Sequence, residues 1–135
     1  MIAARLPFIA VALACAVLGV WLAAASGDEA RLQRAGDDVT AGRNAQALAE
    51  LDDLEGDGAD RAAALRGYAH LGANRLKRAQ AELRAAVQRD PNNWLLQRDY
   101  AVVLLRAGER SRAKARMTRA LALNPRMALP EGFAP

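Results

Sequence analysis

The stretch AQAELRAAVQRDPNN at residues 79–93 recurs in altered form as AKARMTRALALNPRM at residues 113–127. At an offset of 34 residues the matched positions keep their character: Ala79 with Ala113, Leu83 with Met117, Ala86 with Ala120, Val87 with Leu121, and Pro91 with Pro125. Small residues allow two helices to cross closely. Proline ends a helix because it has no N–H and clashes with the preceding turn. The two stretches therefore predict one helical unit that occurs twice in the chain.

The match extends upstream, because Gly67, Ala69 and Leu71 align with residues 101, 103 and 105. Each unit is predicted to contain two helices, over 61–72 and 75–89 in one and over 94–107 and 109–123 in the next. Turns rich in glycine and asparagine separate the helices. The composition is also helical, since alanine, leucine and arginine dominate and aromatic residues make up 4% of the 135. We predict an all-α fold.

The 34-residue period, the small residues and the terminal prolines resemble the tetratricopeptide repeat. The resemblance implies a short α-solenoid of antiparallel helix pairs, with repeats over 60–93 and 94–127. The first of these departs from the family at Arg66 and His70, where leucine and tyrosine are usual. A degenerate repeat is predicted over 28–59, because Gly42 precedes Ala47 by five residues, as Gly108 precedes Ala113. It lacks the proline, and EGDGAD (55–60) is expected to end its second helix instead.

In this family the first helix of each pair lines a concave surface that binds peptides. The resemblance places a groove at positions that are part apolar and part arginine: Arg61, Ala64, Tyr68, Leu71 and Gly72 in one unit, Leu95, Arg98, Val102, Leu105 and Arg106 in the next, and Asn92 and Asn93 between them. The chaperone-type carboxylate clamp is not matched, since its paired lysine and asparagine are absent. Such a lining suits a protein segment with a hydrophobic side chain and an acidic group.

Residues 8–25 carry no charge and are long enough, as a helix of roughly 27 Å, to cross a bilayer core. We expect one N-terminal transmembrane helix within residues 1–27. A cleaved signal peptide ending before Ser26 and lipidation at Cys15 are the alternatives. Arginines on both sides leave the orientation weakly determined, with an extracytoplasmic domain favoured. The single cysteine excludes an intramolecular disulfide.

Charge is divided along the chain. Residues 28–60 contain ten acidic residues and three arginines, whereas residues 61–126 contain fifteen basic and four acidic residues. The basic half raises an alternative function, the binding of anionic lipid or cell-envelope polymer through Arg110, Arg112, Lys114, Arg116 and Arg119. Nucleic acid is not expected, because no aromatic residues are interleaved with these arginines.

No catalytic pattern is present in the sequence. His70 is the only histidine and falls at a packing position of the repeat. DLEGDG (53–58) resembles the start of a calcium loop, but the twelfth position is Ala64 instead of glutamate. We therefore predict a non-catalytic protein without cofactor or metal that binds a protein or peptide. In the tail, 128–135, Leu129 and Phe133 are expected to join Met127 over the last helix; otherwise a partner or self-association would cover that face.

Overall fold

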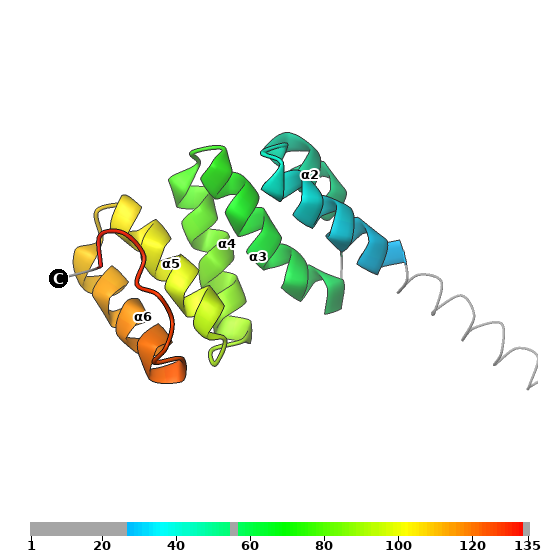
Figure 1. Ribbon diagram of the computed structural model, residues 1–135. Coiled ribbons are helices and arrows are strands. Elements are labelled where there is room, and N and C mark those ends of the chain that lie inside the picture. Colours follow the sequence, from blue (N-terminus) through cyan, green and yellow to red (C-terminus); the bar gives the residue numbers. More distant parts are fainter. Residues whose placement is uncertain (1–26, 55–56, 134–135) are drawn as a thin grey trace, which may run out of the picture.

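The computed structural model describes residues 27–54 and 57–133. Helix occupies residues 27–40, followed by α2 (Asn44–Leu51), α3 (Asp57–Gly72), α4 (Leu76–Arg89), α5 (Trp94–Arg106) and α6 (Arg110–Leu123). These described ranges contain six helices and no strand, which confirms the all-α prediction for them (Figure 1). No helix in them is long and apolar enough to span a bilayer. The uncharged stretch 8–25 lies outside them.

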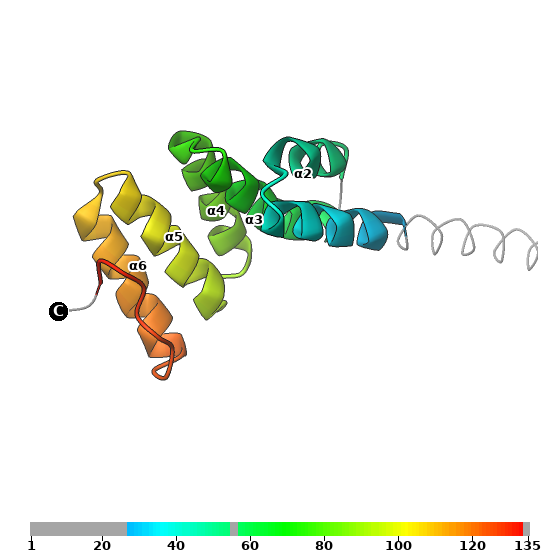
Figure 2. The same ribbon diagram turned by 45° about the horizontal axis from the view of Figure 1, so that its top comes forward.

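The helices form three pairs stacked in chain order, from the 27–40 helix with α2 to α5 with α6 (Figures 1 and 2). The helices of one pair pack together, and α2 with α3 and α4 with α5 join successive pairs. We call 27–40, α3 and α5 the first helices, and α2, α4 and α6 the second helices. The bounds of α3 to α6 agree with the predicted helices to within one residue, except at the start of α3, which lies four residues earlier than predicted.

The turn inside each of the three helix pairs contains one residue with a positive φ angle. Gly42, Asn74 and Gly108 have φ values of 75°, 56° and 83°. Glycine adopts this left-handed conformation at no steric cost, and asparagine tolerates it better than most residues. Behind each of them the next amide N–H bonds back to a carbonyl five residues earlier, as from Glu109 to Leu104 at 2.9 Å. This closes the first helix and starts the second.

The connection between the last two pairs follows from proline and asparagine chemistry. The second helices α4 and α6 end two residues before Pro91 and Pro125, respectively. Asn93 then caps α5, because its side-chain oxygen accepts hydrogen bonds from the amides of Leu95 and Leu96 at 3.1 and 3.3 Å.

The predicted helix break over 55–60 is wrong in part, because α3 begins at Asp57 and its first turn occupies the last four residues of that stretch. Gly58 lies in this turn, close to Leu54 and the side chain of Asp28. Glycine disfavours helix by about 1 kcal/mol relative to alanine. The proximity of Gly58 to Asp28 on the 27–40 helix is a tertiary contribution that a local sequence pattern does not contain.

Small residues at the predicted helix crossings are buried, including Ala79, Ala101 and Ala113. The helices also approach closely at Gly67 on α3, where an added Cβ would stand 2.7 Å from Leu83 Cγ and 3.4 Å from its backbone nitrogen. In the next pair the equivalent positions hold Ala101 and Met117. Ala101 carries a methyl group that Gly67 lacks. Met117, which faces it, is unbranched at Cγ, whereas Leu83 is branched, so the narrower methionine leaves room for that methyl group.

In each helix pair, two equivalent positions join the first helix to the second, but the type of interaction differs between the pairs. Arg34 bonds Glu50 at 3.0 Å, and Arg66 bonds Glu82 at 3.2 Å. The corresponding residues of the last pair are Tyr100 and Arg116, and the guanidinium of Arg116 lies 5.5 Å from the centre of the Tyr100 ring. An ion pair is thus replaced by a cation–π contact.

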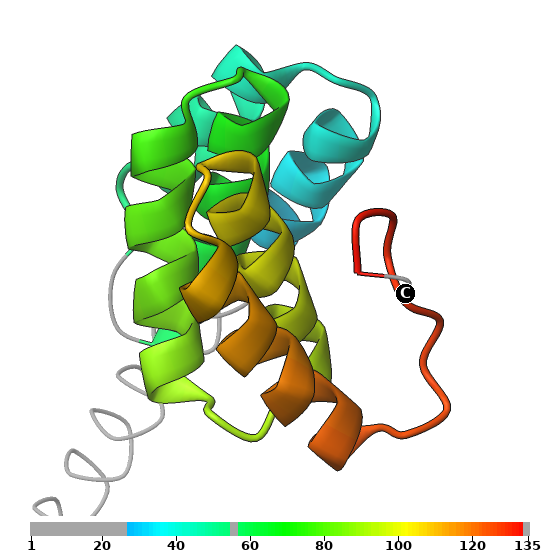
Figure 3. The same cartoon turned by 90° about the vertical axis from the view of Figure 1, so that its left-hand side faces the viewer.

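The C-terminal tail folds back over the last pair, beside α5 and α6 (Figure 3). Met127 and Phe133 pack against the buried cluster of Ala101, Met117 and Ala120. Leu129, which was predicted to join them, is 41% exposed. The tail therefore covers part of the last pair from the side, with Met127 and Phe133 half-buried against it.

Candidate functional site

A cleft of about 510 Å³ opens along the first helices of all three pairs. We call it the groove. It is lined by Leu32 and Gln33 of the first pair, Arg61, Ala64, Leu65 and Tyr68 of α3, and Ala86, Arg89, Asp90, Asn93, Leu95 and Leu96 around the α4–α5 connection. Five positions that the sequence predicted are brought together here: Arg61, Ala64, Tyr68, Asn93 and Leu95.

The groove combines an apolar wall with an exposed anchor point. Leu32 is buried and Leu65 is half-buried, both as parts of the core beneath the first two pairs. Leu95 is different, because 39% of its surface is open to solvent. An apolar side chain of a ligand would remove Leu95 from water, and burial of apolar surface is worth about 25 cal/mol per Å².

Arg61 supplies a charge at the same groove. Its guanidinium makes a two-fold contact with Glu29, one arm of which is 3.1 Å long. The hydrogen bond from Arg61 holds the pKa of Glu29 below its usual range. Both side chains are more than half exposed, so water screens the pair and it contributes little to stability. Arg61 can therefore exchange Glu29 for a carboxylate on a ligand at small cost.

Tyr68 is joined to Arg98 through a residue that sequence reasoning missed. The Tyr68 hydroxyl donates to Asp99 Oδ2 at 2.7 Å, and Arg98 Nε donates to Asp99 Oδ1 at 2.7 Å. Arg98 also lies over the Trp94 ring, 5.5 Å from its centre. Burial, followed by the hydrogen bond to Asp99, raises the pKa of Tyr68 well above its usual value. The network fixes α3 against α5; no local motif marks Asp99.

The remaining predicted groove residues lie elsewhere. Leu71 and Leu105 pack against the core cluster that contains Leu83 and Tyr100. The tail approaches Leu105, since a Cβ on Gly132 would be 2.8 Å from its Cδ2. Val102 is half-buried, and Arg106 is exposed in the last turn of α5. The side-chain oxygen of Asn92 accepts a hydrogen bond from Arg119 of α6 at 2.8 Å. None of the five lines the groove.

The five basic residues proposed as an electrostatic surface do not form a free row. Arg112 pairs with Glu109. Arg116 lies over Tyr100, and Arg119 bonds Asn92. Arg110 and Lys114 are exposed. Most of these arginines are thus already held in place by neighbours within the last two pairs.

His70 is buried on α3 with 8% of its surface exposed, and its Nδ1 has no hydrogen-bond partner among the described residues. Its pKa is lowered chiefly by burial. The charged and titratable groups around it come from three helices and the turn before α4: Asp52 after α2, Arg66 on α3, and Arg75, Arg78 and Glu82 at α4. The arginines lower the pKa further, and Glu82 opposes them. The described residues contain no cluster of metal-binding side chains around it or elsewhere.

We expect the folded protein to lose stability as the pH falls below about 6.5, the usual pKa of histidine. In that range the unfolded chain binds a proton that folded His70 does not, so the free energy of unfolding falls with pH until the folded pKa is passed. His70→Leu copies Leu104 of the next pair and should remove this component. Thermal unfolding of both proteins over a pH series is the measurement. An unchanged pH profile in the variant would contradict the assignment.

Comparison with protein families matches residues 70–129 to a model described as Tetratricopeptide repeat. The match runs from the end of α3 through α6 into the tail. Neither the curated proteins nor the solved structures yield a match. The family match and the six helices of the described residues support a tetratricopeptide-repeat protein. Such repeats generally mediate protein–protein interaction and are typically non-catalytic.

Proposed function

We propose that this chain is a non-catalytic interaction module that binds a short protein segment in the groove. The observation that carries the proposal is the exposed Leu95 beside Arg61 in a cleft lined by all three first helices. Apolar anchors in concave sites supply much of the affinity for a ligand, and a few polar groups orient it. The fitting segment has one large apolar side chain for Leu95 and a carboxylate for Arg61.

The module is built from three repeats, of which the first is degenerate. Its helices, 27–40 and α2, precede the residues that the family model matches. Two observations support their inclusion. Gly42 has the left-handed conformation of Asn74 and Gly108, and Arg34 bonds Glu50 as Arg66 bonds Glu82. Leu32 and Gln33 of this pair also line the groove, so the site needs all three units.

A tether to the membrane is part of the proposal and rests on the sequence of residues 8–25. The full-length protein is expected to stay in the membrane fraction after washing with high salt and then with alkaline carbonate, because an inserted apolar helix is held by the hydrophobic effect. Release into the wash, or a mature protein beginning at Ser26, would remove the tether. Protease accessibility in intact cells would then test the extracytoplasmic orientation.

The groove is tested by placing a photo-crosslinking amino acid at Leu95 in the full chain and identifying the captured protein. Leu95→Ala should weaken binding of that protein by more than about 1 kcal/mol, or roughly sixfold, since apolar anchors dominate interface energy. The measurement is a titration of the purified pair.

Leu129→Ala is the matched control, because Leu129 is the other large apolar residue exposed in the described chain and does not line the groove. It should leave the affinity unchanged. Equal effects of the two variants, or adducts from position 129 and not from 95, would place the partner outside the groove.

A further inference from the structure

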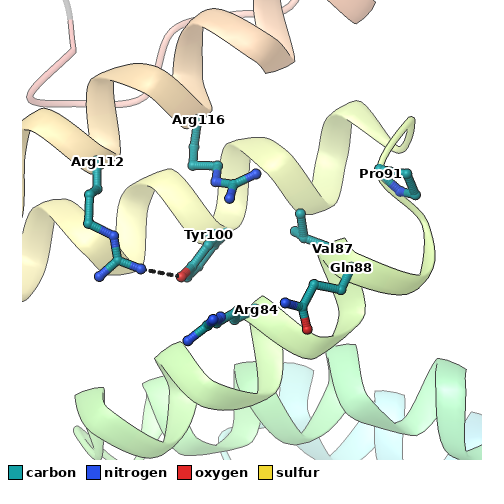
Figure 4. Close-up of a pocket in the computed structure, with 7 residues that line it drawn as sticks. All are labelled: Arg84, Val87, Gln88, Pro91, Tyr100, Arg112 and Arg116. Atoms are coloured by element: carbon teal, nitrogen blue, oxygen red, sulfur yellow. Dashed lines mark hydrogen bonds between the residues drawn. The ribbon is translucent and has the colours of Figure 1, made fainter.

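A second cleft, of about 350 Å³, lies between the second helices α4 and α6 (Figure 4). It is lined by Arg84, Val87 and Gln88 of α4, Pro91, Tyr100 of α5, and Arg112 and Arg116 of α6. We call it the arginine cleft. None of the described residues that line it carries a carboxylate.

Hydrogen-bond donors dominate the polar lining. The Tyr100 hydroxyl oxygen accepts from Arg112 Nη2 at 3.0 Å, and the described residues offer no acceptor for its own proton. Arg84 makes no hydrogen bond or ion pair within the described part of the chain. Arg112 also contacts Glu109, which stands outside the lining and neutralises one of the three guanidinium charges. The cleft therefore offers a net charge of about +2, several N–H groups and the one hydroxyl of Tyr100.

Two of the arginines are held in position before any ligand arrives. Arg116 stacks over the Tyr100 ring and reaches the side-chain oxygen of Gln97 at 3.4 Å. Gln97 is 2% exposed and is fixed in turn by its bond to the Pro91 carbonyl at 2.8 Å. Arg112 is fixed by Glu109 and the Tyr100 hydroxyl. Donors that are already oriented lose little conformational entropy on binding.

The preceding pair of second helices provides an internal comparison. The cleft between α2 and α4 is of similar size, about 360 Å³, and contains Arg78 at the position equivalent to Arg112. It also contains Asp52 and the ion pair of Arg66 with Glu82. In the arginine cleft Tyr100 and Arg116 replace Arg66 and Glu82. The cleft between α2 and α4 thus contains carboxylates, whereas the lining of the arginine cleft contains none.

We propose that the arginine cleft binds a phosphate group, either free or as a monoester on a lipid headgroup. A phosphate dianion matches the net charge, and its oxygens accept several bonds at once, whereas a carboxylate brings one charge and two oxygens. Arginine is well suited to phosphate because its planar fork donates two parallel hydrogen bonds. The site is separate from the groove and does not depend on the proposed protein partner.

The test uses the full chain in maltoside micelles above neutral pH, where phosphate is mainly dianionic. Inorganic phosphate is titrated at constant ionic strength against chloride, and calorimetry and the arginine Nε–Hε NMR signals are recorded. Saturable binding with shifts at Arg84, Arg112 and Arg116 is expected. Arg84→Gln, which breaks no internal contact, and Arg112→Gln should each weaken binding roughly tenfold, the effect of losing one charge-assisted hydrogen bond.

The control is Arg78→Gln, which removes the same charge from the equivalent position of the neighbouring cleft. It should change the affinity by less than about twofold. A loss equal to that of Arg112→Gln would mean diffuse attraction to the basic half and would overturn the proposal. Circular dichroism checks that each variant is folded.

A second arm distinguishes the source of the phosphate. Phosphatidic acid is doped into the micelles, with phosphatidylcholine as its control. Shifts with phosphatidic acid alone assign the site to a lipid headgroup, and shifts with inorganic phosphate at similar affinity assign it to the free or soluble group. Absence of saturable, Arg84-dependent binding in both arms would overturn the site.

Discussion

Tyr100→Ala is expected to lower the free energy of unfolding by about 3–5 kcal/mol, which is the usual effect of emptying a buried aromatic position. Tyr100 is 1% exposed and is the largest of the fully buried side chains. It packs in one cluster with Leu83, Val87 and Leu104, so its ring joins α4 to α5. Its loss should therefore destabilise the stacking of the last two pairs. Thermal and urea unfolding of the full chain in micelles, followed by circular dichroism, measure the change.

Tyr100→Phe separates the ring from the hydroxyl. It keeps the packing and removes only the oxygen that accepts from Arg112, so we expect a loss of about 1 kcal/mol. A Tyr100→Ala variant as stable as Tyr100→Phe would show that the ring does not hold α4 against α5.

Gly67→Ala is the second large expected effect, a net loss of up to about 2 kcal/mol in the free energy of unfolding. Alanine improves helix propensity by up to about 1 kcal/mol, so the substitution stabilises any helix with free space. Here the new Cβ would stand 2.7 Å from Leu83 Cγ, and Leu83 is fully buried. Overpacking in a dense core costs about 1–3 kcal/mol and outweighs the gain. The sign of the change in unfolding free energy is the readout.

Leu83→Met added to Gly67→Ala rebuilds the combination that the next pair uses, Ala101 with Met117. The double variant should recover most of the stability lost in Gly67→Ala. Such a coupling, measured in a double-mutant cycle, is expected only between residues in contact. Additive effects would show that the two positions do not meet at the crossing.

The sequence alone was sufficient for the pairing of the helices and, to within one residue, for the bounds of α4 to α6. Proline, glycine and asparagine act on the backbone within a few residues, so Pro91, Pro125, Gly42 and Gly108 mark helix ends regardless of what packs on them. The 34-residue offset also identified Ala79 and Ala113 as buried positions, since a repeated unit buries the same face each time. Five groove positions, Arg61, Ala64, Tyr68, Asn93 and Leu95, followed from the resemblance and its register.

Only the tertiary structure decided which of those positions are open and what each charge contacts. Asn92 faces Arg119, Leu105 meets the tail, and Asp99 joins Tyr68 to Arg98. These pairs are between 1 and 31 residues apart in the chain, and the 34-residue period does not relate them. The arginine cleft was hidden for the same reason. The lining of this cleft lacks carboxylates because Tyr100 and Arg116 contact each other where the preceding helix pair has the ion pair of Arg66 and Glu82. Such a contact exists only once the helices have packed.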